Sequence, residues 1–401
     1  MQRVPSPVDM TDPELWRRPG AHFGDWFSEE IPAGQVQGTG SIMLFRHADV
    51  REALSDSRLG AMGTQALESM GWSGGPFVEW MRNNIVAMDP PAHTRLRALV
   101  NRAFTPRRVA ELEPLARRVA HELVDEMLLS AEVDFHDAFA QRFPLHIICS
   151  MLAIPDIDHG QMQLWTEAIN EATGLPSESA REAADSALAE MVEYVGSLVE
   201  KRRSSPGDDL VSGLIHAQED GESLNDTELS AMVIQLLVAG HETTRNLIGN
   251  GLFSLICNPE QFRLLRQDPS LMSNAVEEMI RFEPSLIWVA RIPLEDFELG
   301  GVALERDRLV LLNLAAANRD PSIHPNPDRF DVRRENIQVL SFGLGPHFCL
   351  GASLARLEGR IAFDVLLDRV GEIEFVGEAP RFAAFTALRK LESMKVSLKP
   401  A

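Results

Sequence analysis

The sequence predicts one large, mainly helical domain with small β-sheets, spanning residues 1–401. Apolar residues recur at helical spacing through most of the chain, whereas short alternating or extended stretches occur only near its two ends. The composition, with 45% hydrophobic and 24% charged residues, is ordinary for a globular protein that buries a large core. No internal repeat or low-complexity linker divides the sequence, so we expect a single domain.

The expected elements follow in order along the chain. Residues 35–46 have the turn glycines and apolar run of a small hairpin, and residues 47–56 have helical periodicity. The glycine-rich segment 60–77 is expected to be an irregular loop. A helix is predicted over residues 90–104, with Pro90 and Pro91 at its start, and further amphipathic helices follow at 113–128 and 181–203. Between those two, residues 172–180 are expected to form a flexible connection that could serve as a lid.

Charge and cysteine content exclude several classes of protein. The formal net charge of −21 argues against nucleic-acid binding and against attachment to anionic lipid. Three cysteines in 401 residues cannot form a disulfide framework, which favours a reducing, cytoplasmic location. The first residues have no apolar core, and no run of about 18 apolar residues occurs, so we expect no signal peptide and no membrane anchor.

A long helix is predicted over residues 225–258, and its middle carries an unusual polar group. Gly240, His241, Glu242, Thr243 and Thr244 interrupt a sequence that is otherwise apolar on nearly every face. Glycine inside a helix costs about 1 kcal/mol relative to alanine, and a buried carboxylate costs several. The segment is therefore either a kinked core helix with a solvated polar patch, or a place where a flat or bulky group meets a proton-handling acid and hydroxyl.

The segment SFGLGPHFCLG, residues 341–351, places Cys349 between glycines, a histidine and phenylalanines, immediately before a predicted helix. One interpretation is a glycine-rich turn with a small buried thiol. The other is a thiolate held in a dry loop as a metal ligand. A zinc site at His347 and Cys349 would need further Cys or His ligands nearby, and the segment has none. Cys149 and Cys257 lie in apolar runs and are expected to be inert core thiols.

Glu278 and Arg281 are three residues apart on a predicted helix, so their side chains can meet on one face. An ion pair of this kind on the surface contributes little to the stability of the fold. If Arg329, in the proline-rich segment HPNPDRFD, reached both of them, a buried charge network would tie that segment to the helix.

Together, FGLGPHFCLG, AGHETT, EEMIR and PDRFD, in a chain order that places the cysteine segment last, resemble the cytochrome P-450 family of haem-thiolate monooxygenases. The resemblance covers the chain from about residue 45 onward, and the cysteine segment matches the family pattern F-G-x-G-x-H-x-C-x-G at every defined position. An acidic chain without an anchor resembles the soluble bacterial members. The resemblance implies the P-450 fold, with a long central helix over the haem and a loop that carries the cysteine ligand.

The resemblance assigns roles around haem b (iron protoporphyrin IX). Cys349 would be the proximal iron ligand, since a thiolate donates electron density that favours O–O cleavage. Gly343, Gly345 and Gly351 would let the backbone approach the sulfur, and Phe342 would shield it. The matching positions for the haem propionates are His93, Arg97, Arg291 and His347. Glu278, Arg281 and Arg329 match a structural network behind the loop.

On the distal side, the resemblance implies that Gly240 leaves room for dioxygen and substrate. Thr243 would orient activated oxygen and a water molecule, and Glu242 would supply protons from solvent. His241 lies about 100° around the helix from its neighbours, so it is expected to face another helix. Five apolar positions match the substrate pocket and suggest a hydrophobic substrate such as a terpenoid, steroid, fatty acid or macrolide: Val86, Leu236, Ala239, Ile287 and Val289.

Electrons would come from NAD(P)H through a separate reductase and a ferredoxin, because the chain has no flavin or iron–sulfur segment. We expect a monomer. Several arginines could attract an acidic ferredoxin: Arg95, Arg102, Arg107, Arg108, Arg356 and Arg360. The alternative is that these arginines simply pair with Glu111, Glu113 and Glu358. Two other functions stay open: a peroxygenase that uses hydrogen peroxide, against which the Glu242–Thr243 pair argues, and a non-catalytic haem sensor.

Overall fold

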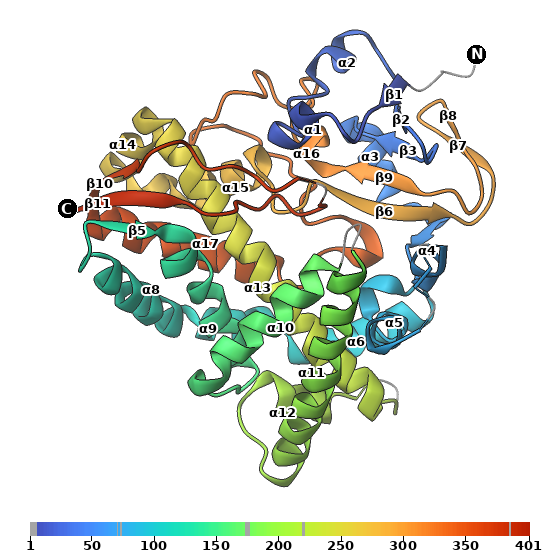
Figure 1. Ribbon diagram of the computed structural model, residues 1–401, viewed down its shortest axis with the longest axis horizontal. Helices are drawn as coiled ribbons and strands as arrows, with labels where there is room; N and C mark the ends of the chain where they lie inside the picture. The colour runs from blue at the N-terminus through green and yellow to red at the C-terminus, as the bar shows by residue number, and fades with distance from the viewer. Residues whose placement is uncertain (1–5, 70, 73, 173–176, 219–220, 385) are drawn as a thin grey trace. The chain divides into compact units, whose positions relative to one another are not determined.

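A computed structural model describes residues 6–69, 71–72, 74–172, 177–218, 221–384 and 386–401 (Figure 1). The chain divides into two compact units. Unit 1 comprises Met1–Gly60, Ala116–Arg142 and Thr243–Ala401, and unit 2 comprises Ala61–Leu115 and Phe143–Glu242. None of the helices among the described residues is long and apolar enough to span a membrane.

The strands belong to three small sheets. The largest has the strand order β1-β2-β3-β9-β6-β4, the second β10-β11-β5, and the third pairs β7 with β8. The strands are β1 (Ser6–Val8), β2 (Gly34–Val36), β3 (Ile42–Leu44), β4 (Leu59–Ala61), β5 (Glu132–Asp134), β6 (Trp288–Pro293), β7 (Phe297–Leu299), β8 (Val302–Leu304), β9 (Val310–Asn313), β10 (Val370–Phe375) and β11 (Lys395–Pro400). The predicted hairpin at 35–46 is confirmed, because β2 and β3 pair antiparallel with Gln35 opposite Ile42.

Helices predominate over strands in both units, as predicted. Unit 1 contains α1 (Pro13–Arg17), α2 (Gly24–Ser28), α3 (His47–Ala53), most of α8 (Glu113–Met127), a π-helical turn η2 (His136–Ala140), α14 (Pro259–Gln267), η4 (Pro269–Leu271), α15 (Met272–Phe282), α16 (Leu314–Ala317), η5 (Gly345–His347) and α17 (Ala352–Arg369). Unit 2 contains α4 (Thr64–Ser69), α5 (Pro76–Arg82), η1 (Ile85–Ala87), α6 (Ala92–Ala103), α7 (Pro106–Glu111), nearly all of α9 (Arg142–Met151), η3 (Asp156–Asp158), α10 (His159–Glu171), α11 (Glu178–Ser204) and α12 (Leu210–His216).

The longest helix, α13 (Asp226–Cys257), confirms the prediction for 225–258 and runs through both units, which divide between Glu242 and Thr243. The expectation of an irregular loop at 60–77 was wrong in part, because α4 and the start of α5 lie there. Part of the expected connection at 172–180, namely 173–176, lies outside the described residues. Residues 178–180, the end of the expected connection, form the start of α11, and the Ser177 side chain just before them accepts a hydrogen bond from the Ala180 amide at 3.2 Å.

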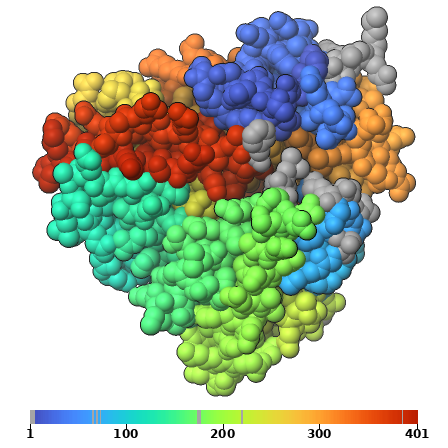
Figure 2. Space-filling view, viewed as in Figure 1, coloured from blue at the N-terminus to red at the C-terminus, as the bar shows by residue number. Residues whose placement is uncertain are grey.

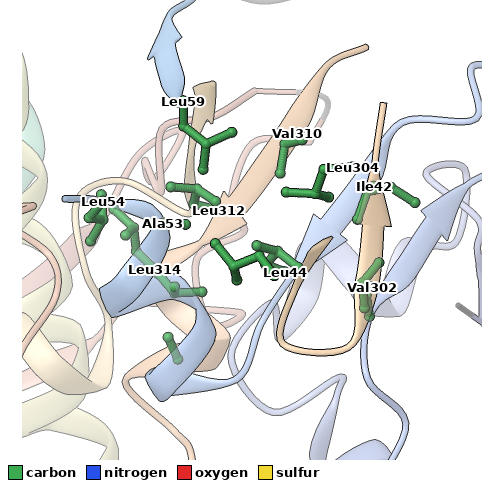
Figure 3. Close-up of a cluster of buried hydrophobic side chains, with 14 of the residues drawn as sticks. Ile42, Leu44, Ala53, Leu54, Leu59, Val302, Leu304, Val310, Leu312 and Leu314 are labelled. Atoms are coloured by element: carbon green, nitrogen blue, oxygen red, sulfur yellow. The ribbon is translucent and has the colours of Figure 1, made fainter. Parts of the chain in front are cut away.

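A hydrophobic core in unit 1 anchors the segment that carries the cysteine. All four residues of β9 are buried, and β9 lies between β3 and β6. The side chains of these strands pack with α3 and the β7–β8 hairpin, as Figure 3 shows for Leu44, Leu54 and Leu312. Leu340 belongs to the same cluster and Leu344 packs against it. The chain leading to Cys349 is therefore fixed by core packing on either side of Phe342.

Candidate active site

The loop before α17 is folded by two glycines. Gly343 and Gly345 both have φ of +67°, a left-handed conformation that other residues adopt at a cost. A Cβ on Gly345 would also lie 3.1 Å from the Leu54 carbonyl oxygen and 3.2 Å from the Ser55 Cα, so this close approach requires glycine. The Gly343 amide donates to the Leu340 carbonyl at 2.8 Å, and the Cys349 amide donates to the Phe342 carbonyl at 2.8 Å.

Cys349 is half-buried and lies three residues before α17 begins at Ala352. The positive end of an 18-residue helix favours a thiolate over a thiol at such a position. The Phe342 ring is held by Arg356, whose guanidinium carbon lies 4.4 Å from the ring centroid, and Arg356 in turn donates to Glu277 at 3.1 Å. The loop is thus braced from α17 and α15.

The other two cysteines differ from Cys349. Cys149 is fully buried, and burial raises the pKa of its thiol, as expected of an inert core thiol. Cys257 is exposed, so the prediction that it belongs to the core was wrong. It lies at the last position of α13, where the apolar pattern of the helix ends.

One face of α13 stays accessible where the rest of the helix is buried. Leu236, Gly240 and Thr243 are half-buried and Ala239 is exposed, whereas Leu237, Val238, His241 and Glu242 are buried. The accessible residues are spaced i, i+3, i+4 and i+7, so they share one face. Close packing also favours glycine at position 240, because a Cβ there would lie 3.2 Å from the Ile148 side chain on α9.

The polar residues beside this face are held in different ways. Ser285 Oγ donates to the Thr243 carbonyl at 2.6 Å, which ties the helix to the segment before β6. His241 is fully buried with Nδ1 3.2 Å from Thr166 Oγ1 on α10, which confirms that it faces another helix. Glu242 is also buried.

Glu358 on α17 is a buried acid that the sequence reasoning did not foresee. The sequence suggested a surface partner for nearby arginines, but Glu358 is 1% exposed. Burial raises the pKa of its carboxyl well above the ordinary value, and the Thr244 hydroxyl opposes this shift only weakly. The carboxyl therefore keeps its proton to a higher pH than a solvated glutamate does. One feature of the sequence could have indicated this burial: Glu358 lies nine residues after Cys349, among the apolar residues of α17.

The four predicted propionate-binding residues come from three elements: α6, β6 and the 3-10 turn η5. His93 and Arg97 lie one turn apart on α6, with His93 buried and Arg97 half-buried. Burial, and then the charge of Arg97, lower the pKa of His93, which keeps the imidazole neutral. Arg291 lies on β6, and His347 lies two residues before Cys349.

The charge network around Glu278 was predicted with one wrong member. Glu278 and Arg281 are fully buried on α15 and form a two-pronged ion pair at 2.6 and 2.9 Å. The third partner is Arg334, whose Nε lies 3.1 Å from both Glu278 oxygens. The Arg329 guanidinium is exposed beside Asp331, and Arg329 joins the network only through its carbonyl oxygen. The two arginines are five positions apart in the sequence, and only the path of the loop selects between them.

The expected pocket residues differ in accessibility. Val86 is exposed and Val289 is half-buried, as are Leu236 and Trp288. Ile287 is buried in a second cluster of unit 1 together with Trp16 and Phe45.

The arginines proposed for docking are partly paired: Arg107 Nε lies 2.9 Å from Glu111, and Arg108 lies 3.3 Å from Asp208.

Comparison with known proteins places these features in a family. The family model "Cytochrome P450" matches residues 35–370. The chain belongs to the cytochrome P450 family. It is 37% identical over 365 residues to the polyketide biosynthesis cytochrome P450 PksS of Bacillus subtilis (strain 168), covering 89% of this chain and 88% of that one. It is 37% identical over 407 residues to the vitamin D(3) 25-hydroxylase of Pseudonocardia autotrophica, covering 98% and 96%. The solved structure of cytochrome P450 CYP109Q5 from Chondromyces apiculatus matches with a TM-score of 0.88 at 34% identity, covering 99% of each chain.

The cytochrome P450 fold is therefore confirmed, and the protein is a haem-thiolate monooxygenase with haem b as its cofactor. Cytochromes P450 act on a small-molecule substrate with dioxygen and electrons from redox partners. The donor set in unit 1 fits the cofactor chemically, because a half-buried cysteine at a helix N-terminus can supply the thiolate that binds iron.

Proposed function

We propose that this cytochrome P450 hydroxylates or epoxidises a hydrophobic small molecule of the polyketide, steroid, terpenoid or fatty-acid type. The observation that carries this proposal is the accessible face of α13, where apolar Leu236 and Ala239 lie one to two turns before Thr243. No charged side chain lies on that face to anchor an ionic substrate. The names of two relatives, for polyketide biosynthesis and for vitamin D(3) hydroxylation, point to substrates of the same apolar character.

In this proposal the Cys349 thiolate ligates the haem iron, and His93, Arg97, Arg291 and His347 hold the propionates. The bound haem supplies dioxygen activation. Neutral His93 donates a hydrogen bond, whereas the two arginines add charge. Gly345 lets the loop approach the Leu54 and Ser55 backbone closely, which fixes the path of the chain four residues before Cys349.

Thr243 and Glu242 handle protons in this proposal. The Thr243 hydroxyl lies on the accessible face of α13, where it can position a water molecule beside the substrate. Glu242 is buried next to it in sequence, so it can hold a proton away from bulk solvent. This pair favours the monooxygenase reaction over the use of peroxide, which needs no delivered protons.

We further propose that a ferredoxin and an NAD(P)H-dependent reductase supply the electrons to a monomeric, cytoplasmic enzyme. Arg107 can help to attract an acidic electron donor although it pairs with Glu111. The pair is exposed to water, so its two charges interact only weakly with each other.

The test is a screen of a lipophilic compound library for low-to-high-spin absorbance shifts, followed by product analysis. Neutral polyketide or steroid skeletons should give shifts and oxygenated products, and charged analogues of the same size should not. Leu236→Phe should alter which skeletons give the shift, whereas Leu129→Phe, at an exposed position outside the site, should not. Shifts restricted to charged polar compounds would contradict the substrate class.

A further inference from the structure

A cluster of two histidines and an aspartate lies within unit 2 and takes no part in the proposed reaction. His146 lies on α9, Asp156 in the 3-10 turn η3, and His159 at the first position of α10. Each offers one ligand atom, and these three atoms lie within 4.8 Å of one another. His159 Nε2 lies 3.5 Å from Asp156 Oδ1, and the two imidazole rings pack edge to face with centroids 4.6 Å apart.

The local sequence produces this juxtaposition. Helix α9 ends at Met151, and Ala153 adopts a φ of +55° that reverses the chain, while the Ile154 amide donates to the Cys149 carbonyl at 2.9 Å. Asp156 and His159 are then three residues apart on successive helical turns, so they share one face. That face meets the last turns of α9, which carry His146.

His159 provides an independent indication that a ligand belongs here. The residue is only 6% exposed, and neither of its ring nitrogens makes a hydrogen bond of normal length and angle within the described structure. Buried polar groups without partners are rare because each one costs free energy.

We propose that His146, Asp156 and His159 bind one divalent transition-metal ion, with Zn²⁺ the best match. Two imidazole nitrogens and one carboxylate oxygen form a ligand set that zinc accepts, with water in the fourth position. Magnesium and calcium prefer oxygen ligands and fit poorly.

The distances suit this ion. Zinc bonds of about 2.0–2.2 Å separate tetrahedral ligand atoms by about 3.4 Å. The His159–Asp156 distance of 3.5 Å already matches this separation. The Asp156 side chain is 92% exposed, so it can rotate to close the remaining gap, and the same side of the cluster is open to water.

The ion would join the end of α9 to the start of α10. Helix α10 packs along α11 (green in Figure 2), and its Thr166 contacts His241 of α13. A metal ion at this corner would therefore brace the helices of unit 2 and stabilise the protein without entering the reaction.

The test uses the full-length, haem-loaded protein, stripped with a chelator and then dialysed against Zn²⁺. We expect one Zn²⁺ per chain by metal analysis and a rise in the midpoint of thermal unfolding. His146→Gln and His159→Gln should each weaken Zn²⁺ binding at least tenfold, the lower end of the roughly 10–100-fold loss seen when only an outer-shell partner is removed. Asp156→Asn, at an exposed position that folding does not depend on, should weaken it as well.

Two matched controls separate this site from adventitious binding. Asp158→Asn removes a neighbouring carboxylate that accepts a hydrogen bond from Tyr194 at 2.6 Å and lies outside the cluster, and His216→Ala removes an exposed histidine elsewhere in unit 2. Both should bind Zn²⁺ as the parent protein does. Absence of stoichiometric Zn²⁺, or equal uptake by the His146→Gln and His159→Gln proteins, would overturn the proposal. The reduced carbon monoxide spectrum should be the same in all variants, so failure here is distinguishable from failure of the haem assignments.

Discussion

The Arg334 guanidinium lies 3.1 Å from the Glu278 carboxylate, which Arg281 also holds, at 2.6 Å. Arg281 also donates to the carbonyl oxygens of Asn318 and Pro327. One buried carboxylate thereby joins α15 to the irregular segment that leads to the cysteine loop.

Loss of Arg334 should therefore destabilise the protein far more than loss of Arg329. The Arg334 side chain is 9% exposed and the Arg329 side chain 67%. Removing one partner of a buried ion pair costs about 3–5 kcal/mol, and an exposed pair contributes about 0–1 kcal/mol. We expect Arg334→Ala to lower the unfolding midpoint and the haem content, whereas Arg329→Ala keeps both, since its carbonyl contact remains. Equal losses in thermal unfolding and haem titration would contradict this network.

Cys349→His should abolish the strongly red-shifted Soret band of the reduced carbon monoxide complex, because the iron would lose its thiolate ligand. The band should move to the position of histidine-ligated haem, and oxygenation should stop. Cys257→Ser is the matched control, since Cys257 is exposed at the end of α13 and should leave the spectrum unchanged. A surviving thiolate band in Cys349→His would show that the ligand assignment is wrong.

Thr243→Ala should keep haem and substrate binding but divert electrons into hydrogen peroxide. The substitution removes the hydroxyl and one methyl group but keeps the contact from Ser285, which goes to the Thr243 carbonyl. Thr243→Ser keeps a hydroxyl and should preserve coupling, and Glu242→Gln should slow turnover with coupling better preserved. The measurement is product formed per NAD(P)H consumed, and an unchanged ratio in Thr243→Ala would exclude the proposed role.

Glu358→Gln should change how stability depends on pH. Burial raises the pKa of Glu358 above its ordinary value of 4.5, so the folded state keeps the proton while the unfolded state releases it. The contribution of Glu358 to the free energy of unfolding is complete below about pH 4.5. It declines as the pH rises toward the pKa of the folded state, by up to about 1.4 kcal/mol per pH unit. Chemical unfolding at several pH values should show a shallower decline for Glu358→Gln than for the parent. An identical decline would mean that Glu358 is ionised when folded.

The first electron transfer from an acidic ferredoxin should slow as salt is added, because exposed charges are screened over about 8 Å at physiological ionic strength. Arg107→Glu should slow it further without changing substrate affinity, since the Arg107 side chain is 89% exposed. Arg17→Glu, at another exposed ion pair, is the control. Arg356 is a poor probe, because it also packs on Phe342 beside the cysteine loop. A rate that responds to neither salt nor Arg107→Glu would exclude electrostatic docking at this residue.

The predictions that rested on local sequence were confirmed where the signal was long or specific. The helix from Asp226 to Cys257 and the hairpin around residues 35–46 appear with nearly the expected bounds. Short helices α4 and α5 were missed because glycines surround them and their periodicity covers barely two turns.

The sequence by itself determined the family and the mainly helical fold, and it singled out Cys349 as the expected thiolate ligand. The cysteine segment and the polar interruption of α13 are local patterns, and their chemistry is set by residues adjacent in sequence. Only the tertiary structure decided which of two nearby arginines reaches Glu278, that Glu358 is buried with a raised pKa, and that His146 meets Asp156 and His159. Each of these depends on which distant segments pack together. Burial and the distance between charges arise from that packing, and they, rather than residue type, set pKa and pairing.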